Sequence, residues 1–537
     1  MTRLVFLLAV WPMAAMPARE EVAREFAKTV TISPGSRISV ESRHGDVVVR
    51  GAPGNQASVR AFIRVSASER PAAEQFAAGI VVDVTNGAGE LRVAVRYPQQ
   101  PGGGSFWDRI FGGQHLGYSV RLEVMAPDTA PLTLRHAFGR VEVDEMKAGA
   151  AITNDNGQVT VRKGRGSHRV ETSFGPMRLD RIAGDVSAVN NNGEVSISDV
   201  AGNVTMRNKF GATDLARISG TVDAQGDNSA VSASDVGGRT NIVTSFGAVT
   251  ALRIRADLVV KNDNGAVEIS DVLGRADVTT KFAKVRFSNI GRGLTVRNDN
   301  GGVDGFKVGG NVMITSSFAG VQAAEVQGDV NLQNDNGSIT VRDIKGSAQL
   351  QTKFAPIEAS DVRKSVSATN ENGAVALRGI EEGATVRTKF GEAVVERVNG
   401  KVDVSNDNGA ITVRQVKGGV SASNKFSRVK VEDVSGTVDI SNDNGEVFAS
   451  GLRRTPGKSC EPIHLSTKFS SLRVQLPSDG DYDLTASTHA GKIQSNVTIG
   501  VTGQVSAERW NGKIGRGGCE LRLTNDNGNI EISGGRS

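Results

Sequence analysis

The chain has 537 residues, too many for one ordinary hydrophobic core, so we expect several domains or a repeat array. Its 64 glycines, its 5% of aromatic residues and its short valine-rich alternations are typical of short strands joined by tight turns. Lys and Arg total 63 against 58 Asp and Glu, and the basic excess is spread along the chain, which argues against nucleic-acid binding.

Residues 1–18 have the layout of a secretory signal peptide. Arg3 precedes an apolar run from Leu4 to Ala15, small residues follow, and Ala18 is the expected last residue of the leader. The run is short for a membrane span, and a retained N-terminal anchor is the alternative. We therefore expect an exported protein, located in the periplasm, in the cell envelope or outside the cell, with no transmembrane span in the mature chain.

Residues 19–130 predict a small, mainly β N-terminal cap with one short helix. Residues 38–51 (ISVESRHGDVVVRG) resemble a first turn of a solenoid, and residues 117–127 (GYSVRLEVMAP) predict a strand. Residues 68–80 (SERPAAEQFAAGI) predict a short helix capped by Ser68. A hairpin around Asn86-Gly87 is expected within residues 80–98.

A glycine-rich loop follows this hairpin and carries Phe106, Trp107 and Phe111. Exposed aromatic residues of this kind can form a contact surface for a partner or for the cell envelope. Alternatively, the three side chains fold back over the end of a solenoid and cover it.

Residues 131–452 repeat a couplet of a Phe-containing phrase and an Asn-Asp-Asn-Gly phrase. Eighteen marker residues are each separated by 18 positions, without insertion or deletion: Phe138, Asn156, Phe174, Asn192, Phe210, Asn228, Phe246, Asn264, Phe282, Asn300, Phe318, Asn336, Phe354, Asn372, Phe390, Asn408, Phe426 and Asn444. A stacked coil must return the chain to the same lateral position at each turn, whereas a loop-rich fold tolerates length changes. The spacing predicts an all-β protein built as an elongated parallel β-solenoid.

Within one repeat, from Gly193 to Phe210, alternation assigns the side chains to two faces. Val195, Ile197, Val200, Val204 and Met206 are expected inside, and the polar residues between them outside. So few apolar side chains cannot offset the conformational entropy of one isolated coil, and stability must come from contacts between stacked coils.

The residue before each marker bears on the length of a coil. It is acidic in the Asn phrases and Lys or Ser in the Phe phrases from Lys209 to Asp443. Coils that each contain two phrases would place acid on acid, which is unfavourable, whereas coils of one phrase place acid beside Lys or Ser. We favour one phrase and about 18 residues per coil, with two phrases and about 36 residues as the alternative. Asn-Gly pairs are expected to adopt the positive φ of a sharp corner; the Phe phrases, where Ala283, Ala319 and Ala355 take the Gly position, are not.

Residues 453–537 lose the strict spacing and predict irregular C-terminal coils and a cap. Cys460 and Cys519, the two cysteines of the chain, both lie there and could form a disulfide in an exported protein. Arg453, Arg454 and Lys458 could instead form a site for an acidic sugar.

Motifs for metal or catalytic chemistry are not found. The six histidines, His44, His115, His136, His168, His464 and His489, lack the spacing of a zinc site and are expected at the surface. The Asp of the Asn-Asp-Asn-Gly runs invites comparison with calcium-binding nonapeptide repeats, but it recurs only in every second phrase rather than at every ninth position. We expect no metal, no cofactor and no catalytic residues.

The order of helix, hairpin ending in VRYP, GYSVRLEVMAP and then runs such as VETSFGPMRLDRIAGDVSAVNNNGEVSISDVAG resembles the bacterial putative-adhesin family of exported β-strand-repeat proteins. The resemblance covers most of the chain after the leader. It implies a β-helical fold at the cell envelope and supplies no site residues.

The sequence therefore favours a non-catalytic β-solenoid of the envelope or exterior, acting as an adhesin or structural scaffold. A monomer is expected, with an envelope polysaccharide or surface protein as partner and without nucleic acid. The alternative is a polysaccharide lyase or glycoside hydrolase, because such enzymes can carry a site in the long groove of a β-helix.

Overall fold

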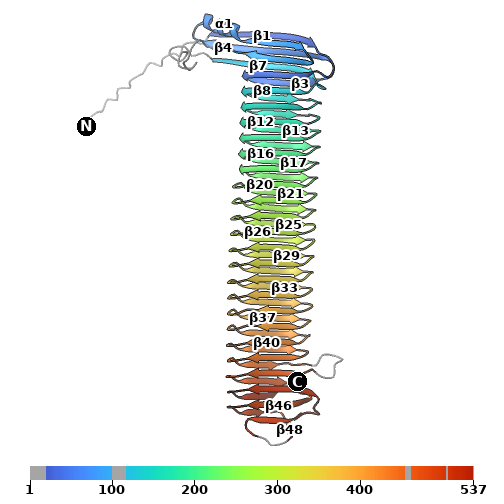
Figure 1. The fold of residues 1–537 in the computed structure, drawn as a ribbon, viewed down its shortest axis with the longest axis vertical. Coiled ribbons are helices and arrows are strands. Elements are labelled where there is room, and N and C mark those ends of the chain that lie inside the picture. The colour runs from blue at the N-terminus through green and yellow to red at the C-terminus, as the bar shows by residue number, and fades with distance from the viewer. Residues whose placement is uncertain (1–19, 99–116, 454–460, 503–505, 536–537) are drawn as a thin grey trace, which may run out of the picture. The chain divides into compact units, whose positions relative to one another are not determined.

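A computed structural model describes residues 20–98, 117–453, 461–502 and 506–535. The chain divides after Gly220 into two compact units, called here unit 1 and unit 2. Both are almost entirely β-structure, and each contains coils whose strands lie side by side in register (Figure 1). The predicted leader, residues 1–18, lies outside the described residues.

Unit 1 begins with an antiparallel cap. Strand β4 (Gln56–Ala67) pairs antiparallel with both β1 (Glu20–Thr31) and β7 (Gly117–Pro127), and helix α1 (Arg70–Gly79) contacts β1 and β4. The hairpin of β5 (Val81–Gly87) and β6 (Glu90–Arg96) completes this region. The expected β-rich cap with one short helix is confirmed.

In the cap, the predicted helix N-cap is wrong, and the predicted hairpin is present with its turn two residues further on. The helix has Glu69, not Ser68, at its N-cap, and it has no side-chain capping bond; a proline in its first turn favours the start instead. The hairpin turns at Ala88 and Gly89, both at positive φ, two residues after Asn86-Gly87. The Asn86 side chain instead donates a hydrogen bond to the Thr31 carbonyl oxygen (3.0 Å).

The remaining strands of unit 1 form two parallel sheets, as residues 38–51 and the repeats predicted. The first sheet contains β3 (Asp46–Ala52), β9 (Val141–Asp144), β11 (Val159–Arg162), β13 (Met177–Ile182), β15 (Val195–Val200) and β17 (Thr213–Ile218). The second contains β2 (Arg37–His44), β8 (Leu132–Phe138), β10 (Ala150–Asn156), β12 (His168–Phe174), β14 (Val186–Asn192) and β16 (Val204–Phe210).

Unit 2 continues the same plan with a strand of each sheet in every coil. Its second-sheet strands are β18 (Val222–Asn228), β20 (Thr240–Thr244), β22 (Leu258–Asn262), β24 (Ala276–Thr280), β26 (Leu294–Asn298), β28 (Val312–Ser316), β30 (Val330–Asn334), β32 (Ala348–Thr352), β34 (Val366–Asn370), β36 (Ala384–Arg387), β38 (Val402–Ser405), β40 (Val420–Asn424) and β42 (Val438–Asn442). Its first-sheet strands are β19 (Val231–Val236), β21 (Val249–Ile254), β23 (Val267–Val272), β25 (Val285–Ile290), β27 (Val303–Val308), β29 (Val321–Val326), β31 (Ile339–Ile344), β33 (Ile357–Val362), β35 (Val375–Ile380), β37 (Ala393–Val398), β39 (Ile411–Val416), β41 (Val429–Val434) and β43 (Val447–Ser450).

The register of the parallel strands fixes the length of a coil. Ala150 pairs with His168 in unit 1, and Thr280 pairs with Asn298 in unit 2, so residues paired on neighbouring strands are 18 positions apart. Asn156 correspondingly pairs with Phe174, which places the two phrases of the couplet in one column. The predicted parallel solenoid and its shorter coil, with one phrase per turn, are confirmed.

The inward positions match those predicted for residues 193–210. Val195, Ile197, Val200, Val204 and Met206 are all buried. Along β15, Val195 and Ile197 are two positions apart, whereas Ile197 and Val200 are three apart. The extra position arises because Asp199 has a φ of 55°, in the left-handed region, which shifts the inward and outward alternation by one residue. A similar positive φ recurs once in every coil at non-glycine positions from Lys163 to Asp361, and again from Arg397 to Asp433.

The C-terminal end of unit 2 departs from strict chain order. Beyond β44 (Ile463–Thr467) and β45 (Leu472–Leu476), the chain forms β46 (Tyr482–Thr488), β47 (Ile493–Ser495), β48 (Ile499–Val501) and β49 (Arg509–Ile514) before β50 (Cys519–Asn525) and β51 (Ile530–Gly534). Strand β50 pairs with β44 on one side and β46 on the other, and β49 runs antiparallel to β46 and β48. Antiparallel, short strands therefore close this end.

Candidate functional site

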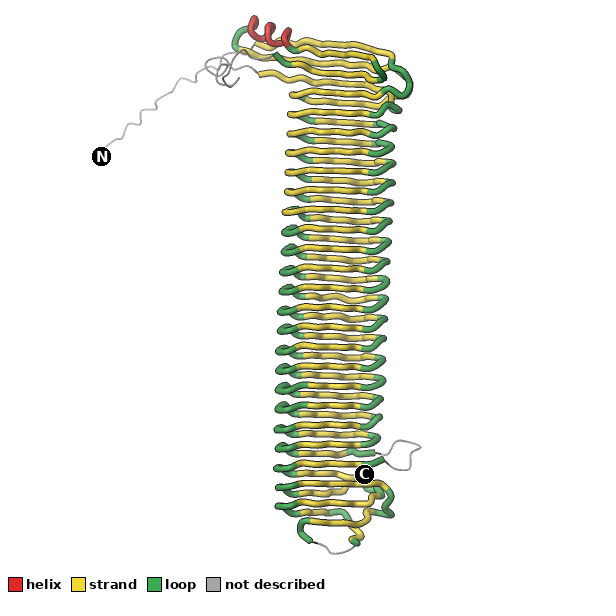
Figure 2. The backbone as a smooth tube through the Cα atoms, viewed as in Figure 1, coloured by secondary structure: helices red, strands yellow, loops and turns green. Residues whose placement is uncertain are grey.

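The turn from a second-sheet strand to the next first-sheet strand, called here the tip corner, has a fixed pattern of burial. At residues 280–283, Thr280 and Ala283 are buried, whereas Lys281 and Phe282 between them are exposed. The loops of successive coils lie one above another within unit 2 (Figure 2). Each corner thus presents two outward residues, and the corners together form two parallel lanes.

A buried ladder of Asn and Thr side chains supports the tip corners. Asn298 donates from Nδ2 to the carbonyl oxygens of Ala283 in the preceding coil (2.8 Å) and of Gly301 in its own turn (2.7 Å). Its Oδ1 accepts from the Gly301 backbone N–H (3.2 Å). Asn334, Asn370, Asn406 and Asn442 repeat the bond to the preceding coil, each at 2.8 Å.

The Thr of the Phe phrases has a related role. Thr352 donates from Oγ1 to the carbonyl oxygen of Gly337 in the preceding coil (3.2 Å). Buried backbone groups at a turn need such partners. The first Asn of the Asn-Asp-Asn-Gly run therefore has a structural role, because its side chain joins each turn to the turn of the preceding coil by a hydrogen bond.

The predicted positive φ at Asn-Gly corners holds only in unit 1. Gly157 and Gly193 have φ values of 133° and 149°, but the corresponding glycines of unit 2 are not in the left-handed region. Gly301 is needed there for a different reason, because an added Cβ would lie 1.8 Å from the Ala283 carbonyl oxygen. The Phe phrases of unit 1 also use positive φ, at Gly175 and Gly211.

The first lane of the tip corners alternates in charge. Acidic residues occupy the Asn coils of unit 2, and Lys or Ser occupies the Phe coils. Each Lys pairs with the acid of the preceding coil: Lys281 with Asp263 (3.0 Å), Lys353 with Asp335 (2.8 Å), Lys389 with Glu371 (3.7 Å), Lys425 with Asp407 (2.8 Å) and Lys468 with Asp443 (2.7 Å). The interleaving that favoured the shorter coil is therefore present as ion pairs.

The second lane alternates between Phe and Asn. Its seven phenylalanines in unit 2, called here the Phe row, are Phe246, Phe282, Phe318, Phe354, Phe390, Phe426 and Phe469, and they are 59 to 64% exposed. Exposed Asn residues occupy the intervening coils, and Asn336 donates from Nδ2 to the Ser317 carbonyl oxygen (3.0 Å). A regular row of exposed aromatic rings is a candidate interaction surface.

The opposite corner carries the left-handed residues and a second set of ion pairs. Arg217 contacts Asp199 through two bonds of 2.7 Å, and Arg253 contacts Asp235 at 2.6 and 2.7 Å. The sequence-based predictions did not include this column, because Arg, Lys, Glu and Gln occupy many of its positions and do not indicate a positive φ. The Asp residues and Asn289 tolerate this conformation, and Gly379 and Gly451 favour it, so these residues and their recurrence at the interval of the coil were the available signals.

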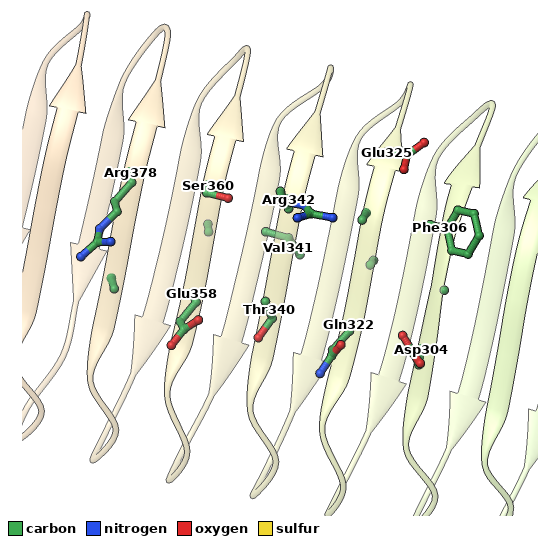
Figure 3. A pocket seen from close by; sticks show the side chains of 15 residues that line it. Asp304, Phe306, Gln322, Glu325, Thr340, Val341, Arg342, Glu358, Ser360 and Arg378 are labelled. Carbon is green, nitrogen blue, oxygen red and sulfur yellow. The ribbon is translucent and has the colours of Figure 1, made fainter.

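A hollow of about 720 Å³ lies on the first sheet of unit 2 (Figure 3). Asp304, Gln322, Thr340 and Glu358 occupy one column of it on successive strands. The two carboxylates are therefore three strands apart, about 14 Å at the usual strand spacing. That separation exceeds the roughly 5 to 9.5 Å between the carboxyl groups of glycoside hydrolases.

The predicted contact residues Phe106, Trp107 and Phe111 lie outside the described residues. Cys460 also lies outside them, whereas Cys519 begins β50, is buried and is not a free thiol. The pairing of the two cysteines stays a prediction. Arg454 and Lys458 are likewise outside the described residues, and Arg453 forms an ion pair of 3.8 Å with Asp433 of the preceding coil.

The expectation of surface histidines is wrong for two of them. His136 and His168 are only 4% and 1% exposed, because both point inward from second-sheet strands. Burial lowers the pKa of both imidazoles, and the Nδ1 atom of His168 lies 3.0 Å from the Gly166 carbonyl oxygen. Among the described residues, no group of three or more His, Cys, Asp and Glu is arranged to hold a metal ion.

Comparisons with known proteins give one structural likeness. No protein-family model and no curated protein matches the chain. A solved structure described as a putative cell adhesion protein from Clostridium sporogenes is 9% identical, and the match covers 43% of this chain and 99% of that one. Its TM-score is 0.18, so the likeness is distant. No helix in the described part of the chain is long and apolar enough to cross a membrane.

Proposed function

We propose that the chain is an exported, non-catalytic β-solenoid that serves as an adhesive or structural scaffold at the cell envelope. The observation that carries the proposal is the repetition of one coil plan, with equivalent outward positions in every coil, along unit 2. Repeated modest contacts add through effective concentration, and this suits multivalent attachment. Catalysis instead needs a few groups held in one asymmetric arrangement.

The polysaccharide-acting enzyme is the second candidate, since the hollow of Figure 3 brings acidic and basic side chains to one strand face. Arg342 and Arg378 lie in the column beside Glu358 and could bind an acidic sugar. The wide separation of Asp304 and Glu358 weighs against hydrolysis by these two of the three carboxylates that line the hollow, Glu325 being the third.

Two internal deletions distinguish the scaffold from the polysaccharide-acting enzyme. Removing residues 330–365 takes out two whole coils, including Arg342 and Glu358, and removing residues 402–437 takes out two coils away from the hollow. Binding of the full chain and both variants to isolated envelope fractions is measured beside release of reducing or unsaturated ends from a polysaccharide panel.

A scaffold is expected to fold in both variants, retain most envelope binding in both and release no sugar ends. Loss of a measurable sugar-releasing activity from the first deletion alone, in a folded protein, would establish the enzyme. Absence of binding to every envelope fraction by the full chain would refute attachment.

A further inference from the structure

We propose that the Phe row of unit 2 is a self-association surface that binds a second, antiparallel copy of this chain. The spacing of the Phe residues along the stack is the first support for this proposal. Phe residues recur every second coil, about 9.6 Å apart at the usual strand spacing of about 4.8 Å. That gap admits one ring from an opposing row, whose centre would lie about 4.8 Å from each neighbour, within the favourable range of 4.5–7 Å for offset aromatic pairs.

The Asn coils provide the space that such interlocking needs. Each ring of one copy would enter over an Asn tip of the other copy, and the Asn side chain is shorter and polar. The Nδ2 atoms of Asn372 and Asn444 already donate to backbone carbonyl oxygens, at 3.1 and 3.0 Å, which holds these side chains against their own turns. The alternation of Phe and Asn is therefore self-complementary in shape.

Charge complementarity selects the antiparallel arrangement. A two-fold axis perpendicular to the stack, placed between a Phe coil and the adjacent Asn coil, brings every Phe coil opposite an Asn coil. The same operation sets the first lane against the first lane, so that Lys353 and Lys389 face acids of the other copy. A parallel two-fold pair would instead keep acidic coils level with acidic coils, which is unfavourable.

The available apolar area is sufficient for a dimer. A Phe side chain can bury about 150–250 Å², and seven rings that are 59 to 64% exposed offer roughly 600 to 1,100 Å² in each copy. A standard stable interface buries about 800 Å² per partner. The Phe row reaches that size without help from other surfaces.

Full overlap of the two rows makes a specific prediction of which residues meet. The seven Phe tips and seven Asn tips of unit 2, from Phe246 to Asn527, pair first with last. Lys281 then faces Asp443 of the other copy, and Lys468 faces Asp263. Within one copy, each of these pairs is separated by at least nine coils, about 43 Å.

The first test is the oligomeric state of the full chain by sedimentation velocity across a concentration series. We expect a dimer at about 10 µM, because interfaces of this size dissociate at micromolar concentrations or below. The variant F318N/F354N/F390N places in three tips the residue that already occupies the intervening ones, and it should weaken dimerisation at least tenfold. The control L273N/F306N/M313N changes three other exposed apolar residues of unit 2 and should dimerise as the wild type does.

The second test is zero-length carbodiimide cross-linking of the wild-type chain, followed by peptide mass spectrometry. Links between Lys281 and Asp443 and between Lys468 and Asp263 are expected in the dimer band. A monomer throughout the series, equal dimerisation of the F318N/F354N/F390N variant, or a dimer band whose links join only the same or adjacent coils, would overturn the proposal. A monomer would agree with the oligomeric state expected from the sequence, and the Phe row would then have to bind a partner other than a second copy of this chain.

Discussion

The two asparagines of each Asn-Asp-Asn-Gly run have opposite environments. Asn334 is buried and bonds to Ala319 O (2.8 Å) and Gly337 N (3.1 Å), whereas Asn336 two residues later is exposed. Asn334 thereby satisfies two backbone groups that water cannot reach, and the environment of a repeated residue depends on its place in the coil.

Replacing Asn334 with Ala should destabilise the surrounding coils by about 2 to 4 kcal/mol, because a buried donor and a buried acceptor lose their partner. The matched variant Asn336→Ala should cost less than about 1 kcal/mol, since water can replace its single bond. Hydrogen exchange of the amides in β30 and β32 measures both effects. Equal protection in the two variants would contradict a structural role for the ladder.

His168 occupies an apolar column of β12, between Ala150 and Val186, and its Nε2 is buried without a hydrogen-bond partner. Burial lowers its pKa from the ordinary value of 6.5 in the folded state. The unfolded chain therefore binds the proton first as pH falls, so the contribution of His168 to the stability of unit 1 is fully present above about pH 6.5 and is lost as the pH falls below it.

The variant His168→Val should remove part of this pH dependence. We expect the change in the free energy of opening between pH 7.5 and 5.5 to shrink, by at most about 1.4 kcal/mol, since one titrating group contributes no more than that for each pH unit below 6.5. Hydrogen exchange of β12 and β14 at both pH values measures it, with exposed His489→Val as the control. An unchanged pH dependence in His168→Val would show that other groups cause it.

At the scale of one coil, the sequence predicted the architecture well because stacking makes geometry periodic. The strict interval between markers and the order of charges before Phe and Asn were sufficient to choose the coil length, and the ion pair of Lys353 with Asp335 agrees. Hydrophobic alternation was likewise sufficient to place Val195 and Ile197 inside.

The features that the sequence did not predict correctly depend on contacts between coils. Gly301 is required by the carbonyl of the preceding coil rather than by its own φ, and Asp199 adopts a positive φ despite having a side chain. His168 is buried because its column is inward, which overrides the usual preference of histidine. Exposure of the Phe row could not be read from composition, since Phe is usually a core residue.

Two deletions test whether the two-coil couplet is the unit of stability. Removing residues 366–383 brings Lys353 beside Lys389, whereas removing residues 366–401 brings Lys353 beside Asp407. The single-coil deletion should lower the free energy of unfolding by about 0.2 to 1 kcal/mol through like-charge repulsion. The urea midpoint should fall accordingly, and the loss should diminish at high salt. The two-coil deletion should match the wild type at all salt concentrations. Equal midpoints at low salt would contradict a role for the alternating lane.

At the scale of the whole molecule, the closing strands cover the last regular coils of unit 2. A stack of parallel coils ends in unpaired backbone donors and acceptors, which can add further strands from other chains. In unit 2 the antiparallel pairs of β49 with β46 and β48, together with the return of β50, lie beyond the last regular coils.

A chain truncated after Ser450 should retain the regular coils and lose this closure. We expect aggregation that grows with concentration, monitored by light scattering, because β42 and β43 become open edges. The variant lacking residues 402–437 keeps the closing strands and serves as the control. If the truncated chain scatters no more light than the control, the closing strands are not what prevents aggregation of the stack.

The constant register also has a genetic consequence. Every coil of the regular region begins and ends at equivalent positions. Unequal recombination between repeats in the gene would therefore join one coil to another without changing the register of the strands at the junction. Because Phe with Lys or Ser and Asn with an acid alternate, events that add or remove two coils preserve the alternation of the tip corners. Length is then a heritable trait that can change by copy number in steps of one couplet, while the residues at each tip stay the same.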